Sequence, residues 1–244
     1  MIESFEHFML IINEYWEPFL FWDGTHFSGL AVTLWILTLS VVLGFVLALP
    51  LSVMRVSKNK FISGPIWFFS WVFRGTPFYV QLLLIYSGIV GLEFVRETPL
   101  LYAFFVSGYN CVVLALLLNT LAYTIEIFAG YIKATPYAEL DAARAYGMSR
   151  WKMYTRIILP SALRRALPAY SNEVILMLHA TSLAFTATVP DILKVARDAN
   201  AATYLTFASY GTAALLYMSI SFVLVWAFRR IERRALAFLA YEKN

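Results

Sequence analysis

The sequence is poor in charged residues. Only 14% of its 244 residues are Asp, Glu, Lys or Arg, whereas 61% are hydrophobic. Soluble globular domains average about 25% charged and about 45–50% apolar residues. The composition therefore excludes an ordinary soluble domain and predicts an all-α integral membrane protein built as one membrane domain.

Several chemistries lack the residues they need. The single cysteine, Cys111, lies in an apolar stretch, so neither an internal disulfide nor a cysteine metal cluster is expected. The three histidines, His7, His26 and His179, are scattered, and no Ser/His/Asp set has a suitable spacing. No GxxxxGK[ST] phosphate loop occurs, and the GMSRWK run at residues 147–152 is not one. We expect no enzyme, no bound cofactor or metal, and no nucleic-acid partner.

The first 28 residues lack Lys and Arg altogether. They carry five acids, Glu3, Glu6, Glu14, Glu17 and Asp23. The apolar runs at 8–12 and 19–22 are too short to span a bilayer. An acidic start does not resemble a cleaved signal peptide. Residues 1–28 are therefore predicted as an aromatic-rich segment at the outer interface of the membrane.

From residue 29 onward, long stretches with few or no charges predict membrane spans. Residues 29–54 contain no charge, and 26 helical residues can cross a hydrocarbon core of about 30 Å. The RGTP sequence at 74–77 should break the next apolar region into an inner-leaflet piece and a second span. The five predicted spans are residues 29–54, 77–92, 109–132, 166–189 and 210–228.

The distribution of Lys and Arg predicts the orientation. The segments 1–28, 93–108 and 190–209 hold three of these residues, whereas 55–64, 133–165 and 229–244 hold fifteen. Because cytoplasmic loops are enriched in Lys and Arg, the N-terminus should lie outside and the C-terminus inside. The long polar segment 133–165 is then cytoplasmic. Residues 229–234 are expected to act as a stop-transfer and headgroup anchor.

The segment 133–165 has the signals of two short helices with a corner between them. Thr135 and Pro136 suit a helix start, Gly147 suits its end, and Ser149 can cap a second helix that ends before Pro160. The acids and small residues of the first helix are Glu139, Asp141, Ala142, Ala143 and Ala145. The segment could form a compact docking element, or it could rest on lipid headgroups as an amphipathic loop.

Two sequences in this segment carry a resemblance. DAARAYG at 141–147, then nine residues, then IILP at 157–160 resembles the EAA signature of the membrane subunits of ABC importers. Asp141 stands where the family usually has Glu, which keeps the charge. The resemblance implies a type I ABC importer permease fold. It also implies that residues including Glu139, Asp141, Gly147 and Pro160 form a coupling helix that docks on an ATPase subunit.

Further motifs resemble the polar amino-acid permeases within this family. They are FRGTPFYVQL at 73–82, AYTIEIFAG at 122–130 and LPAYSNEVIL at 167–176. In LHATSL at 178–183, His179 replaces the Lys of most relatives, as in the M-type subunits of histidine and lysine/arginine/ornithine importers. The resemblance implies a multi-pass permease subunit of the bacterial inner membrane that serves basic amino acids. Its implied partners are an ATPase dimer using ATP and Mg²⁺, a homologous Q-type permease and a periplasmic binding protein.

Polar residues inside the spans are candidates for a substrate path, because such residues are costly in a bilayer. Asn119, Tyr123 and Glu126 share one helical face, and Asn172 and His179 share another. Glu173 lies beside the second face, and Thr76 and Gln81 flank the helix break, where free backbone groups can meet a substrate.

Two interpretations of these residues remain open. Glu173 or Glu126 could meet a positively charged substrate side chain. Alternatively, the polar groups could pair with each other, with Arg74 or with a partner subunit. The pattern of spans and polar residues is also compatible with a permease for a different polar amino acid, an autonomous channel or secondary transporter, and a membrane scaffold.

Overall fold

A computed structural model describes residues 2–237, with side chains described from residue 6. Within that range every regular element is a helix. The long helices are α1 (Ile2–Leu20), α2 (Gly29–Arg55), α3 (Lys60–Gly75), α7 (Gly108–Lys133), α10 (Leu159–Thr181) and α12 (Thr206–Ala235). The shorter α-helices are α4 (Phe78–Leu83), α5 (Glu93–Glu97), α6 (Pro99–Phe105), α8 (Tyr137–Ala145), α9 (Arg150–Met153) and α11 (Ile192–Thr203). Two π-helical turns, η1 (Leu84–Gly88) and η3 (Tyr154–Ile158), and two 3₁₀ turns, η2 (Ile89–Gly91) and η4 (Ala184–Ala187), complete the set.

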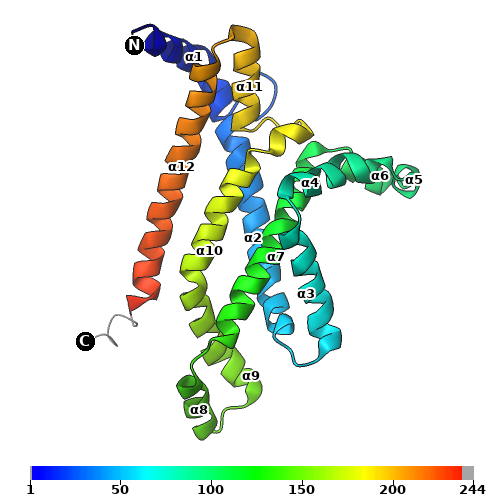
Figure 1. Ribbon diagram of the computed structural model, residues 1–244, viewed down its shortest axis with the longest axis vertical. Coiled ribbons are helices and arrows are strands. Elements are labelled where there is room, and N and C mark those ends of the chain that lie inside the picture. Colours follow the sequence, from blue (N-terminus) through cyan, green and yellow to red (C-terminus); the bar gives the residue numbers. More distant parts are fainter. Residues whose placement is uncertain (1, 238–244) are drawn as a thin grey trace.

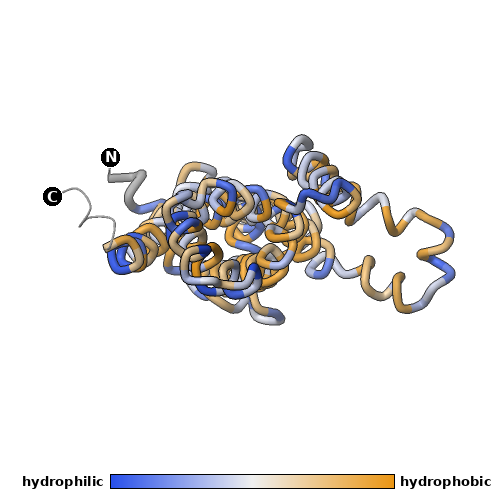
Figure 2. The backbone as a smooth tube through the Cα atoms, turned by 90° about the horizontal axis from the view of Figure 1, so that it is seen from below, coloured by the Kyte–Doolittle hydropathy of each residue, from blue (hydrophilic) through white to orange (hydrophobic). Residues whose placement is uncertain are grey.

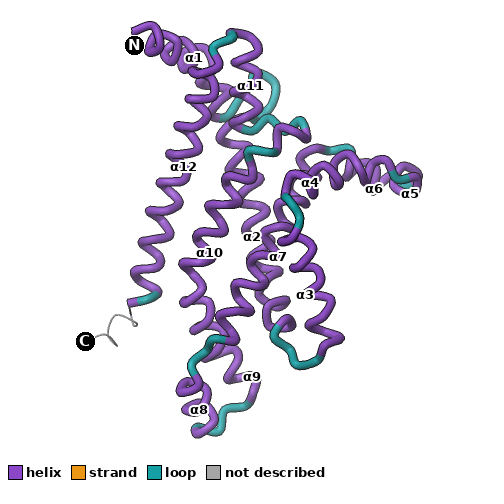
Figure 3. The backbone as a smooth tube through the Cα atoms, in the orientation of Figure 1, coloured by secondary structure: helices purple, strands orange, loops and turns teal. Residues whose placement is uncertain are grey.

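The long helices form an elongated bundle (Figure 1). Helix α7 packs against α2, α3 and α10, and α12 packs against α10, α11 and α1. Helices α1 and α11 lie at one end of the bundle and α8 and α9 at the other, while α4 to α6 form an arm that leaves the bundle sideways. Loops are confined to short connections (Figure 3). Seen from below, apolar residues dominate the tube of the bundle and polar residues appear in patches (Figure 2).

Three helices, α2, α7 and α12, are long and apolar enough to cross a membrane. Helices α2 and α7 match the predicted spans 29–54 and 109–132 within one residue at each end. The pair of α3 and residues 78–91 passes the same test only as a bent unit. Helix α10 has 23 residues but fails it, because Arg164, Arg165 and Glu173 lower its apolar character. The five-span count therefore stays a prediction.

The predicted break at RGTP is present, and the chain bends there by 105°. The piece that follows is not one straight α-helix, as the prediction of a span over 77–92 required. Helix α4 has six residues and passes into η1 and η2. Gly88 and Gly91 have low helix propensity, which agrees with the loss of regular α-helix there.

The prediction that a helix ends before Pro160 is wrong. Helices α9, η3 and α10 follow one another directly from Arg150 to Thr181, with Pro160 in the first turn of α10. In the π-helical turn η3, each backbone hydrogen bond spans five residues instead of four. This turn lies just before Pro160, which has no N–H group to donate. The predicted fourth span, 166–189, is displaced accordingly: α10 ends at Thr181, and the chain turns through η4 to Thr188, whose φ is 61°.

The segment 190–209, predicted as a polar loop, contains α11, and Asp191 anchors it. The buried Asp191 carboxylate accepts hydrogen bonds from the backbone N–H groups of Leu193 (3.3 Å) and Lys194 (2.9 Å) and from the Tyr217 hydroxyl of α12 (3.1 Å). Burial raises the pKa of this carboxyl to about 6. Since the Gly29 N–H donates to Pro190 O at 2.8 Å, the start of α2 is joined to the same point. This end of the bundle is held by one polar junction.

Helix α12 is also longer than the predicted fifth span, 210–228.

Candidate functional site

The corner at Gly147 has the predicted geometry. Gly147 has a φ of +64°, in the left-handed region that favours glycine. Its N–H donates to Arg144 O at 2.9 Å, and the Met148 N–H donates to Ala143 O at 3.1 Å. These two bonds satisfy the last carbonyls of α8 in the pattern of a Schellman motif. Two residues later, the Ser149 side chain accepts from the Lys152 N–H and caps α9, as predicted.

The predicted cap at the other end of α8 is wrong. The Thr135 hydroxyl does not cap α8 but donates to Ile132 O at 2.9 Å, at the end of α7. Pro136 occupies the N-cap position of α8 and makes no side-chain bond there. The last carbonyls of a helix need donors outside it. Thr135 therefore supports the end of α7 rather than the start of α8.

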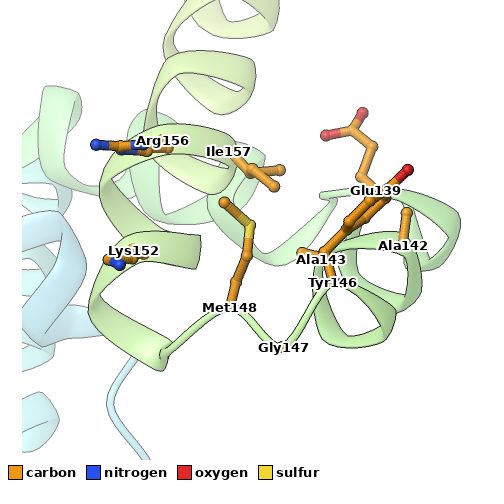
Figure 4. A pocket seen from close by; sticks show the side chains of 9 residues that line it. All are labelled: Glu139, Ala142, Ala143, Tyr146, Gly147, Met148, Lys152, Arg156 and Ile157. Carbon is orange, nitrogen blue, oxygen red and sulfur yellow. The ribbon is translucent and has the colours of Figure 1, made fainter.

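A groove lies between α8 and the helix that begins at α9 (Figure 4). Its volume is about 620 Å³. Its lining residues are Glu139, Ala142, Ala143, Tyr146, Gly147, Met148, Lys152, Arg156 and Ile157. Met148 and Ile157 lie between the two helices in Figure 4. Tyr146 is 89% exposed at the rim. The groove is open, partly apolar and bordered by two cations, so it can receive a side chain from another protein.

Glu139 and Asp141 play different roles in α8. Asp141 pairs with Arg144 at 2.7 Å, and both side chains are well exposed. Glu139 faces α10: the Ser161 hydroxyl donates to its Oε1 at 3.3 Å, and Arg165 Nη1 lies 3.7 Å from the same atom. Asp141 is therefore available to an external partner, whereas Glu139 fastens α8 to the bundle.

Arg165 of α10 also connects α8 to the end of α7. Its Nη2 donates to Thr135 Oγ1 at 3.2 Å and to Tyr131 O at 3.5 Å, both at the end of α7. Its side chain is 15% exposed. One guanidinium thus contacts α7, α8 and the residues between them from its position on α10. We call Arg165, Glu139 and Thr135 the coupling joint. Arg165 was not among the site residues predicted from the sequence. The only sequence feature that could have indicated its role is its position as a cation next to the start of the predicted span 166–189.

Three of the predicted path residues gather at the α3–α4 break. The Gln81 amide nitrogen donates to Phe73 O (2.7 Å), with Thr76 Oγ1 (2.8 Å) and Thr76 O (3.0 Å) also within reach. Asn119 on α7 donates to Gln81 Oε1 at 3.1 Å and lies 3.3 Å from Phe73 O. We call Thr76, Gln81 and Asn119 the break cluster. Its amides bind carbonyls that the interrupted helix leaves free.

Tyr123 and Glu126, on the same face of α7, also have partners in the chain. The Tyr123 hydroxyl donates to Arg74 O at 3.4 Å, and the Arg74 guanidinium lies 5.3 Å from the Tyr123 ring centroid. Glu126 pairs with Arg55 at the end of α2, with Nε–Oε1 at 2.6 Å and Nη2–Oε2 at 3.4 Å. Both side chains of the ion pair are 20% exposed or less. The pair joins α2 to α7.

The candidates on α10 are differently placed. Glu173 is 3% exposed, and its Oε1 is a buried atom with no hydrogen-bond partner among the described residues. Its polar neighbours are the Thr120 hydroxyl of α7 and the Arg74 guanidinium. Asn172 and His179 are exposed, and His179 Nε2 lies 3.5 Å from the Ser221 hydroxyl of α12. We call Asn172, Glu173 and His179 the α10 face.

Comparison with known proteins shows the class to which this fold belongs. Residues 23–236 match the family model of binding-protein-dependent transport system inner membrane components. The chain belongs to this family, and it is an inner-membrane transport component rather than an enzyme. The fold is that of type I ABC importer permeases.

Particular relatives are close. The chain is 65% identical over 224 residues to the histidine/lysine/arginine/ornithine transport system permease protein HisM of Escherichia coli (strain K12), covering 92% of this chain and 94% of HisM. It is 40% identical over 205 residues to the octopine transport system permease protein OccM of Rhizobium radiobacter, covering 84% and 83%. Among solved structures, a chain of an amino acid ABC transporter crystallised with histidines aligns with a TM-score of 0.78 and 29% identity, over 92% of this chain and 97% of that one.

Proposed function

We propose that this chain is a membrane-spanning permease subunit of an ATP-driven importer for basic amino acids, namely histidine, arginine, lysine and ornithine. The observation that carries the proposal is the 65% identity to HisM, which extends over almost the whole of both chains. The proposal places residues 1–28 and α11 on the periplasmic side and residues 133–165 in the cytoplasm, in agreement with the Lys and Arg distribution.

ATP hydrolysis belongs to a separate ATPase dimer in this proposal. The groove between α8 and α9, together with exposed Asp141 and Tyr146, is the surface offered to that dimer. Closure of the ATPase dimer on ATP and Mg²⁺ pulls α8, and the coupling joint passes the displacement to α10. The bundle then changes between outward-open and inward-open states. The second permease subunit is a homologous Q-type chain, and a periplasmic binding protein delivers the substrate.

The α10 face would line the substrate path. Glu173 supplies a buried carboxylate with an unoccupied acceptor atom, and a cationic side chain can satisfy both its charge and its hydrogen bonding. Asn172 and His179, exposed on the same helix, extend the path along α10. The break cluster and Glu126 hold the bundle instead, because their polar atoms already bind within the chain.

The test is uptake by the reconstituted complex. This chain, a Q-type subunit and the ATPase are placed in vesicles, and labelled arginine and histidine are offered with a binding protein. Uptake should require ATP and should stop when the ATPase is inactivated by mutation. Uptake that continues without the ATPase would instead indicate an autonomous channel or secondary transporter.

A second candidate substrate class is an amino-acid derivative such as octopine, favoured by the 40% identity to OccM. Competition distinguishes the two. Excess unlabelled octopine should leave arginine uptake unchanged if the chain serves the simple basic amino acids. Strong inhibition would favour the second class.

A further inference from the structure

One exposed, strongly charged surface takes no part in the function proposed above. The C-terminal half of α12 carries an open depression of about 600 Å³ between its side chains. The lining residues are Phe222, Val225, Trp226, Arg229, Arg230, Arg233 and Arg234, all on one side of the helix. We call this surface the α12 basic stripe. Its first three residues are apolar, and four guanidinium groups follow them directly along the helix.

The four arginines of the stripe have no carboxylate partner in the part of the chain that the structure describes. The acid in the same stretch, Glu232, faces the other way: its Oε1 accepts from the Ser171 hydroxyl of α10 at 2.9 Å. Arg230 lies 5.9 Å from the Trp226 ring centroid. The stripe therefore presents unneutralised cations, one of them next to an aromatic ring.

The apolar part of the stripe faces away from the bundle. Phe222 and Trp226 are 65% and 64% exposed. Helix α12 is apolar enough to cross a membrane, yet only 17% of its most apolar window is buried in the chain. This side of α12 is consequently available to lipid hydrocarbon, and the arginines follow where the hydrocarbon would end.

We propose that the α12 basic stripe is a binding site for an anionic phospholipid. Arg229, Arg230 and Arg233 contact the phosphate groups, and one acyl chain lies along Phe222 and Trp226. Guanidinium groups bind phosphate oxygens in a bidentate way, which lysines cannot do. A stop-transfer cluster needs charge alone, whereas this surface combines four guanidiniums with an adjoining apolar wall. An acidic segment of a soluble partner would match the charges but not the apolar wall inside the bilayer.

The test measures which lipid lies next to Trp226. The full-length chain, assembled with its partner subunits, is placed in phosphatidylcholine nanodiscs containing a small fraction of brominated phosphatidylglycerol, which quenches nearby tryptophan. The contribution of Trp226 is obtained by subtracting the signal of Trp226→Phe. Quenching should exceed that produced by the same fraction of brominated phosphatidylcholine, which reports random contact.

Three double variants decide the outcome. Arg230→Gln with Arg233→Gln should reduce the enrichment of phosphatidylglycerol about tenfold, since each basic residue near a membrane surface contributes appreciably to anionic lipid binding. Arg230→Lys with Arg233→Lys keeps the charge that sets topology and should give an intermediate enrichment. Lys58→Gln with Lys60→Gln, exposed cations elsewhere in the chain, should leave it unchanged.

Two results would overturn the proposal. Equal loss of enrichment in the Lys58/Lys60 control would mean that net charge, and no site on α12, attracts the lipid. Unchanged enrichment in the Arg230/Arg233 glutamine variant, with loss of a copurifying subunit, would assign the stripe to protein contact instead.

Discussion

The break cluster and the α10 face carry the same signal in the sequence but differ in the structure. Both consist of polar side chains in apolar helices. At the break, Gln81 and Asn119 bind carbonyls released by the interruption of α3, and they bind each other. On α10, Glu173 is buried with an unpartnered oxygen, and Asn172 and His179 are exposed. The comparison separates polar groups that complete the fold from polar groups that the fold leaves available.

The largest effect is expected at Glu173. Glu173→Gln should lower the uptake of arginine and histidine at least about tenfold, because hydrogen bonds to charged groups contribute about 1.5–3 kcal/mol. Thermal stability should be unchanged or higher, since the substitution removes a buried charge with an unused acceptor. Uptake kinetics and thermal unfolding are measured on the same preparation. If the Glu173→Gln variant takes up substrate with the affinity and rate of the wild type, Glu173 does not belong to the substrate path.

The coupling joint tests whether α10 moves with α8. Arg165→Gln should lower the amount of substrate transported per ATP severalfold while ATP hydrolysis continues, since α8 then loses its ion pair to α10. Glu139→Gln removes the other partner, and the double variant should be no worse than either single one, because interacting residues are not additive. Transport and phosphate release are measured together. Proportional loss of both activities, or strictly additive effects, would contradict a transmitting role.

At the break, Gln81→Leu should act on stability. It removes the hydrogen bonds that Gln81 makes to Phe73 O and Thr76 and the one that it accepts from Asn119, and each such bond contributes about 0.5–1.5 kcal/mol. Thermal unfolding should shift downward, and uptake per correctly folded complex should stay near wild type. Tyr79→Leu, on the exposed side of the same short helix, is the matched control. A Gln81 variant with normal stability and altered substrate preference would place the break cluster on the path after all.

The smallest effect is expected at Asn172. Asn172→Ala should change stability by less than about 0.5 kcal/mol, as is usual for exposed positions. If the α10 face lines the path, the apparent affinity for substrate should change a few-fold. Titration of uptake against substrate concentration measures it. No change at both Asn172 and His179 would restrict the path on α10 to Glu173.

Local signals predicted several elements correctly. The charge-free run at 29–54 and the polar-faced run at 109–132 are helices within one residue, because length and apolarity decide such spans. The Gly147 corner and the Ser149 cap follow from the chemistry of single residues. Thr135 and Pro160 were misassigned because each suits two positions. Thr135 can serve the end of α7 as well as the start of α8, and Pro160 fits the first turn of a helix that a π turn continues.

The sequence by itself determined the class of the protein, the two most apolar spans, the break at residues 74–77 and the corner at Gly147. The class follows from the family motifs at 73–82 and 141–160, whereas the spans, the break and the corner depend on hydropathy or on backbone restrictions within a few residues. The tertiary structure decided which polar groups are satisfied. The Gln81–Asn119, Arg55–Glu126 and Arg165–Glu139 contacts join residues 38, 71 and 26 positions apart, so no local pattern contains them. Only the packing of α3, α7, α8 and α10 leaves Glu173 buried with a free oxygen.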